Sequence, residues 1–193
     1  MRLRHLSGLF VSAILAASSG QAAQAPKLSD VAGKYGVAPS SRIAFSVGQV
    51  GGGGIKGVFG KFSGTFTLEG GDLQHSTVVF TLWPESVESG EKRIDTFLKS
   101  TAVFDTVNFD VINFRSSSIK QTGPDTATMT GQLSAKGQTR TENFDVKLTR
   151  WSGKSIAFNV TGDVFRSRYS MDVGTPIYSN VVHFDMSVEG ERK

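Results

Sequence analysis

The chain of 193 residues contains no cysteine and is poor in histidine, tryptophan and tyrosine, with three, two and three of each. The lack of cysteine excludes a disulfide framework and a lipid anchor attached to a cysteine. The protein must therefore derive its stability from a hydrophobic core.

Motifs for catalysis or metal binding are also scarce. The sequence has no GxSxG and no HExxH motif. Beyond residue 25 the only histidines are His75, in an expected turn, and His183, on an expected strand, so we expect no metal site. Asp95 opens a short helical pattern, where a helix cap or ion-pair partner is the more common role than a catalytic acid. We therefore predict no catalytic residue, no cofactor and no enzyme.

The start of the chain has the pattern of a secretory signal peptide. Arg2 and Arg4 precede a short apolar run from Leu6 to Ala17, and small residues follow it. Pro26 directly follows Ala25 and disfavours cleavage there, which makes cleavage after Ala22 the better site. We expect residues 1–25 to be a signal peptide and residues 26–193 to be one domain. The pattern is bacterial and predicts export to the periplasm.

Charge gives little indication of a partner. Of the 21 basic residues, 19 remain once Arg2 and Arg4 are removed, against 17 acidic ones, so the net charge is about +2. No basic stretch is interleaved with aromatic residues, and we expect no binding to nucleic acid.

What the chain has in quantity is phenylalanine and glycine, with 14 and 22 residues. Apolar and polar residues alternate in many short segments, as in half-buried strands, and no long helical pattern occurs. About eight strands at this spacing indicate an antiparallel sandwich or barrel, and we favour the barrel because its interior can hold one small ligand. The predicted strands cover residues 35–37, 42–47, 55–68 (one long or bent strand), 77–82, 109–117, 127–133, 141–148, 155–165 and 181–188.

The hydrophobic period changes between Arg93 and Ser116. Ile94, Phe97 and Leu98 have helical spacing, whereas the residues from Phe109 onward alternate as in a strand. We predict one short helix within residues 92–104, which covers the barrel like a lid.

Four consecutive glycines at 51–54 admit two interpretations. A glycine-rich loop can bind phosphate through its backbone N–H groups, but no helix start or lysine–serine partner follows. A hairpin loop at the barrel rim is the preferred interpretation.

The apolar faces of the expected elements point inward, where they line a tunnel or fill an ordinary core. Alternation alone does not decide between these. The predicted lining residues are Phe45, Val47, Phe62, Phe66, Phe80, Phe97, Phe114, Met129, Phe144, Phe158 and Phe184.

Several motifs, in order, resemble the YceI-like family of bacterial lipid- and polyisoprenoid-binding proteins, of which this chain looks like a divergent member. In their order and spacing, the motifs extend over nearly the whole mature chain: Ser41–Phe45, Gly57–Gly64, Asp95–Ser100, Phe104–Asp105, Ile112–Ser116, Gly131–Gly137, Arg166 and Met171. The resemblance implies an all-β fold: an extended, eight-stranded, antiparallel, lipocalin-like barrel with a helical cover and a long isoprenoid or other lipid inside. It also implies a homodimer.

The chain departs from the family pattern near the expected cover. Ser40 and Ile94 replace a usual His and Arg, Phe97 replaces a His, and Ser170 replaces a Gly. These exchanges bring the family's head-group contacts into question. Arg166 and Arg168 flank an irregular segment and have two interpretations, as contacts to a ligand head group or as solvated surface residues.

Three functions are consistent with these patterns. The first is a periplasmic carrier for a long apolar lipid, such as a polyisoprenoid, an isoprenoid quinone or a fatty-acid-like chain, with transient contact to a membrane or a membrane protein. The second is a packed barrel that acts in interaction or stress response without a ligand. The third is an enzyme that acts on a lipid in the same pocket.

Overall fold

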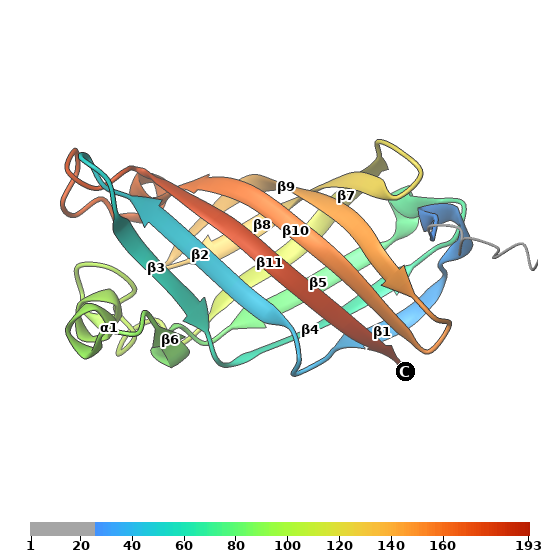
Figure 1. The fold of residues 1–193 in the computed structure, drawn as a ribbon, viewed down its shortest axis with the longest axis horizontal. Coiled ribbons are helices and arrows are strands. Elements are labelled where there is room, and N and C mark those ends of the chain that lie inside the picture. Colours follow the sequence, from blue (N-terminus) through green and yellow to red (C-terminus); the bar gives the residue numbers. More distant parts are fainter. Residues whose placement is uncertain (1–25) are drawn as a thin grey trace, which may run out of the picture.

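The computed structural model describes residues 26–193, so the predicted signal peptide lies outside the described residues. These form an elongated antiparallel barrel with one short α-helix, α1 (Lys92–Lys99) (Figure 1). The strands are β1 (Gly33–Val37), β2 (Arg42–Gly48), β3 (Gly54–Phe59), β4 (Phe62–Leu68), β5 (Thr77–Leu82), β6 (Val87–Glu88), β7 (Ile112–Gln121), β8 (Thr126–Ala135), β9 (Gln138–Trp151), β10 (Ser155–Phe165) and β11 (Val181–Arg192).

Eight strand positions close the barrel. Pairing runs in the order β1-β4-β5-β7-β8-β9-β10-β11, and β11 pairs again with β1. The remaining strands, β2, β3 and β6, continue the positions of β1, β4 and β5 beyond a bend. β11 pairs with β1 through residues 190–192 and with β2 through residues 183–187, so β1 and β2 occupy one position in succession. The prediction of an eight-stranded antiparallel barrel is confirmed.

Two further positions in the barrel are each occupied by two successive strands, one by β3 and β4 and the other by β5 and β6. β3 ends at Phe59 and β4 begins at Phe62, and each pairs with the matching part of its neighbours. Backbone hydrogen bonds continue across the bend, from the Gly60 N–H to the Ser86 carbonyl (3.0 Å) and from the Trp83 N–H to the Lys61 carbonyl (3.1 Å). The predicted long or bent strand over residues 55–68 is therefore β3 followed by β4.

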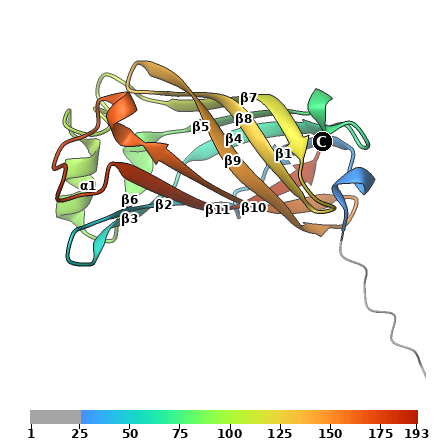
Figure 2. The ribbon, with the colours of Figure 1, turned by 90° about the horizontal axis from the view of Figure 1, so that it is seen from above.

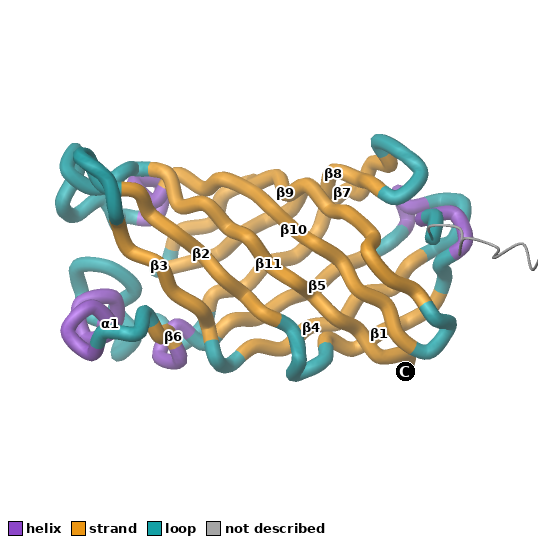
Figure 3. Tube along the Cα trace, in the orientation of Figure 1, coloured by secondary structure: helices purple, strands orange, loops and turns teal. Residues whose placement is uncertain are grey.

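The two ends of the barrel differ in what covers them. Most helical segments lie at these ends, as Figure 3 shows, and Figure 2 gives the same arrangement from above. The 3₁₀ turn Pro84–Ser86 lies instead beside β6, at the bend. We call one the lid end, where residues 89–111 with α1, the β2–β3 loop and the β10–β11 segment (166–180) lie. We call the other the terminal end, where β1 begins and β11 ends. It carries two 3₁₀ turns, η1 (Leu28–Asp30) and η2 (Leu73–His75).

The alternation of apolar and polar residues along each strand determines which side chains face the interior of the barrel and which face its outside. On β8 the side chains of Ala127, Met129 and Leu133 are buried. The residues between them form side-chain hydrogen bonds along the outer face with β9, including Thr128 to Asp145 (3.0 Å) and Gln132 to Thr141 (2.9 Å). The hydrophobic face therefore lies inside, as the alternation predicted.

In the tight and glycine-rich connections, the backbone adopts the conformations that the sequence indicates. Lys136 and Gly137 join β8 to β9 with φ of 46° and 73°, a turn with both central residues left-handed. The glycines at 51–54 all have positive φ and connect β2 to β3, which supports the hairpin-loop interpretation. One boundary prediction was wrong: the strand expected from Phe109 begins at Ile112, and the Phe109 ring packs near Gly137 instead.

Phenylalanine rings cover inward-facing glycines on strands nearby in the wall, four of them on the adjacent strand and one two strands away. At Gly57 the ring of Phe45 lies 2.7 Å from the place a Cβ would take, and at Gly64 the ring of Phe80 lies 2.8 Å from it. The same arrangement is tighter still at three further glycines, whose covering rings come from Phe114, Phe144 and Phe66: Gly131, Gly162 and Gly190. Because each ring occupies the place of a missing side chain, it lies along the wall instead of filling the centre.

We expect Gly131→Ala to destabilise the barrel. A methyl group there would collide with the Phe114 ring and with the Arg115 carbonyl oxygen, 2.5 Å away. Overpacking of this kind costs about 1–3 kcal/mol. Urea denaturation measures the loss, with Gly48→Ala as the control because no atom lies within 4 Å of its added methyl. Equal stability of the two variants would contradict the covering role of the ring.

Candidate functional site: an apolar cavity along the barrel

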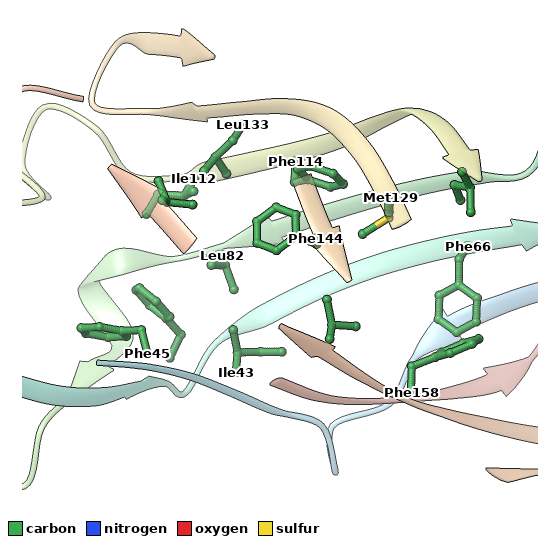
Figure 4. Close-up of a cluster of buried hydrophobic side chains, with 14 of the residues drawn as sticks. Ile43, Phe45, Phe66, Leu82, Ile112, Phe114, Met129, Leu133, Phe144 and Phe158 are labelled. Carbon is green, nitrogen blue, oxygen red and sulfur yellow. The ribbon is translucent and has the colours of Figure 1, made fainter. Parts of the chain in front are cut away.

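A cavity of about 210 Å³ runs through the interior. Its lining reaches from Leu28 and Leu73 at the terminal end to Leu98 and Met171 at the lid end, so it follows the long axis. Figure 4 shows apolar side chains from several strands converging on this space. Pockets for drug-sized ligands typically measure about 300–1,000 Å³. This smaller space, lined from one end of the barrel to the other, suits a thin chain better than a bulky ring.

Nine of the eleven predicted lining residues line this cavity. The Phe114 and Phe144 rings meet edge to face, with centroids 5.3 Å apart, and Phe66 meets Phe158 in the same way at 5.8 Å. Aromatic pairs prefer this geometry. The nine are Phe45, Val47, Phe66, Phe80, Phe114, Met129, Phe144, Phe158 and Phe184.

The other two predicted residues lie elsewhere. Phe62 is the first residue of β4, at the bend, and its ring stacks on Phe80 (6.1 Å between centroids) without reaching the cavity. Phe97 lies on α1 with 38% of its surface exposed. Leu98 is the α1 residue that lines the cavity, about 100° around the helix from Phe97. Both assignments to the lining were therefore wrong.

Sequence reasoning missed the residues that line the two ends. At the lid end, Phe104 inserts between Phe45 and Phe59, with ring centroids 6.4 and 5.7 Å away. Apart from Leu98 on α1, the residues that were missed lie in short 3₁₀ turns or loops, where neither the helical nor the strand period applies. The missed end residues are Leu28, Leu73, Leu98, Val103, Phe104, Tyr169 and Met171.

Arg166 organises the β10–β11 segment. Its side chain is buried, at 7% exposure, and all five N–H groups have acceptors within that segment. Nε donates to the Ser179 carbonyl (2.7 Å), Nη1 to the carbonyls of Met171 and Val173, and Nη2 to Thr175 Oγ1 and the Tyr178 carbonyl. Burial lowers the pKa of the guanidinium, with a nearby Asp acting in the opposite direction. Neither sequence interpretation fits, because Arg166 is not on the surface and has no donor left for a head group.

Arg168 forms an ion pair with a buried carboxylate. Its Nη1 lies 2.9 Å from Glu142 Oε1, which also accepts a hydrogen bond from the Tyr169 hydroxyl at 2.8 Å. Glu142 is only 5% exposed. Burial and this hydrogen bond raise the pKa of Tyr169, which therefore remains a neutral donor. The group fixes the β10–β11 segment to β9.

Polar contacts also hold the lid segment, residues 89–111. Asp95 accepts hydrogen bonds from the Ser89 hydroxyl and backbone N–H, both at 2.6 Å, and these lower the pKa of Asp95. Glu85 accepts a hydrogen bond from Thr106 (2.8 Å) and pairs with Lys99 (3.4 Å). Asp95 lies within the first turn of α1 and ties it to Ser89, before the helix. The N-cap position is Glu91 and has no side-chain capping hydrogen bond, so the helix-cap role considered for Asp95 is not observed.

The two histidines of the described chain lie apart. His75 pairs with Asp72 at the terminal end, and His183 pairs with Asp163 near the lid end, each at 2.7 Å. Within residues 26–193, no group of three or more metal-ligating side chains gathers in a place that could hold a metal ion. None of the helices described there is both long and apolar enough to span a bilayer.

Comparison with known proteins settles the family. Residues 35–190 match the YceI-like domain. The chain belongs to the YceI-like family. It is 26% identical to protein YceI of Salmonella arizonae over 186 residues, and the alignment covers 94% of each chain. Protein YceI of Salmonella enteritidis PT4 matches over the same length at the same identity.

Three solved structures share this fold. BcnA of Burkholderia cenocepacia superposes with a TM-score of 0.74 and 22% identity, over 79% of this chain and 98% of that one. A polyisoprenoid-binding domain from Saccharophagus degradans gives 0.69 and 15%, over 84% and 100%. The YceI protein of Campylobacter jejuni gives 0.68 and 20%, over 73% and 86%.

We expect Arg166→Lys to destabilise this YceI-like barrel. A lysine ammonium can donate three hydrogen bonds in place of five, and each charged bond contributes about 1.5 kcal/mol or more, so the loss is about 3 kcal/mol. Chemical denaturation measures it. Arg115→Lys, at an exposed position on β7, is the matched control and should change stability by less than about 0.5 kcal/mol. Unchanged stability of Arg166→Lys would contradict the organising role.

Proposed function

We propose that this YceI-like protein is a carrier that holds one long apolar lipid chain inside its barrel. The observation that carries the proposal is the cavity, which runs the length of the barrel and whose wall is apolar. A chain that enters gains roughly 0.8 kcal/mol for each CH₂ removed from water, offset in part by the ordering of the chain. A polyisoprenoid, the tail of an isoprenoid quinone or a fatty-acid-like chain has this chemistry.

The family supports the class of ligand. One structural relative is described as a polyisoprenoid-binding domain, and it shares the barrel with this chain. The wall offers a hydrocarbon chain apolar contacts, and the polar atoms of its lining residues Arg166 and Tyr169 are bonded to other parts of the protein, which favours binding over chemistry. A homodimer and a transient contact with a membrane or membrane protein remain predictions of the sequence.

We further propose that the mature protein starts near Ala23 and functions in the periplasm. The basic start, the apolar run and the small residues before position 26 support this. The intact mass of the exported protein should correspond to cleavage after Ala22. A product that retains Met1 would contradict the proposal.

Filling the middle of the cavity should remove the lipid. Val160, on β10, is buried and lines the cavity, whereas its neighbour Asn159 is exposed on the outer face. We expect protein purified from its own host to carry lipid detectable by native mass spectrometry. Val160→Phe should lose that lipid with little change in melting midpoint, because its ring enters open space.

Asn159→Phe is the matched control and should keep the lipid. In a filled core, Val160→Phe would instead overpack the interior and cost about 1–3 kcal/mol. A melting midpoint lower by several degrees, with no lipid in any form of the protein, would reject the carrier and favour the packed barrel.

A further inference from the structure

The segment of residues 28–32, together with Leu73, closes the terminal end of the cavity, and we call this closure the floor. The Leu28 N–H donates to the Pro124 carbonyl of the β7–β8 turn (2.8 Å). Arg192, at the end of β11, donates to the Ala32 carbonyl (2.7 Å). The β4–β5 loop packs against this segment, because a methyl group on Gly70 would contact the Ala32 side chain at 3.1 Å. A backbone hydrogen bond to the β7–β8 turn and a hydrogen bond from the Arg192 side chain therefore hold residues 28–32 in place.

Two leucines form the inner surface of this floor. Leu28 belongs to η1 and Leu73 to η2, and both line the cavity at the terminal end. They are almost completely buried, at 3% and 6% exposure. A chain that extends along the cavity would therefore end against these two side chains.

The lid end is closed in a different way. Apart from side-chain contacts, the backbone of residues 91–110 forms hydrogen bonds only within that stretch. The Lys136 ammonium joins it to the β10–β11 segment, with hydrogen bonds to the carbonyls of Thr101 (2.8 Å) and Ser170 (2.9 Å). Side-chain hydrogen bonds and the packing of Leu98, Val103 and Phe104 thus hold the lid, and it can move away without the loss of any strand pairing. Elements outside the strand ladder are the ones that open locally.

Exposed apolar side chains distinguish the same end. The four most exposed large apolar residues of the described chain all lie at the lid end, in the β2–β3 loop, after α1, at the end of β10 and in the β10–β11 segment. They are Val50, Val107, Phe165 and Ile177, with exposures from 49% to 91%. An apolar chain that leaves water would meet apolar contacts there first.

We propose that the lipid enters tail first at the lid end, and that Leu28 and Leu73 set the longest chain the barrel accepts. The apolar wall excludes a polar head group from the interior, so the head stays at the lid end. The specificity is then for the length of a single unbranched or prenyl chain. This inference rests on the proposed carrier function.

Two matched leucines test the proposal. Leu73 and Leu98 line opposite ends of the cavity and are equally buried, at 6% and 5% exposure. Each variant, Leu73→Ala and Leu98→Ala, removes about three carbon atoms from the lining. Delipidated protein is mixed with equimolar linear saturated fatty acids of graded length, and native mass spectrometry identifies the bound chains. Circular dichroism and melting curves check that each variant is folded.

Leu73→Ala should raise the longest bound chain by about three carbons, the number that the substitution removes. Leu98→Ala should leave it unchanged. Leu73→Phe places a larger side chain at the terminal end of the cavity and should shorten the longest bound chain. This variant tests the proposal if Leu73→Ala does not fold. Equal length profiles for all folded variants, or a shift in Leu98→Ala alone, would overturn the assignment of the floor. Failure of the wild type to bind any of the fatty acids or its own host's lipid would instead reject the carrier function.

Discussion

Phenylalanine rings that lie over inward-facing glycines decide the shape of the interior. An eight-stranded barrel is narrow enough for its side chains to fill it, so a cavity needs large residues that do not point to the axis. Here each such ring takes the place of a side chain that its neighbouring glycine lacks, as Phe80 does at Gly64. The ring is buried against backbone and still leaves the axis open. Five of these pairs, on several strands, preserve one continuous space.

Arg166 is the one charged residue that lines that space within the described chain, and its charged group is used to shape the cover of the cavity. Arg166 directs all its donors to carbonyl and hydroxyl oxygens of its own segment, and Glu142 accepts from Arg168 and Tyr169. No buried side-chain nitrogen or oxygen in the described chain lacks a hydrogen-bond partner. Burying a charge is tolerable only when it is paired in this way. The irregular segment at the lid end thus keeps one conformation without placing polarity on the cavity wall.

Residues on the wall of the barrel could be predicted from the sequence, whereas those that line its two ends could not. Strand faces repeat every second residue, so Phe114, Met129 and Phe144 could be assigned to the interior from alternation alone. Phe97 could not be oriented, because a helix of two turns offers too few residues to define its buried face. Arg166 looked like a surface residue because its acceptors come from a loop whose path depends on tertiary contacts. Leu28 and Leu73, single apolar residues in 3₁₀ turns, had no periodic neighbours to reveal them.

The apolar cavity also bears on how the molecule responds to hydrostatic pressure. Pressure favours the state of smaller volume, and unfolding eliminates internal voids in proportion to their size. A space of about 210 Å³ with an apolar wall gives water few hydrogen bonds and therefore little reason to enter. Compressibility then depends on what the interior holds, because a hydrocarbon chain that occupies the void removes the volume on which pressure acts. The same barrel, with identical strands and hydrogen bonds, would thus be more compressible with an empty cavity and less compressible with the cavity filled.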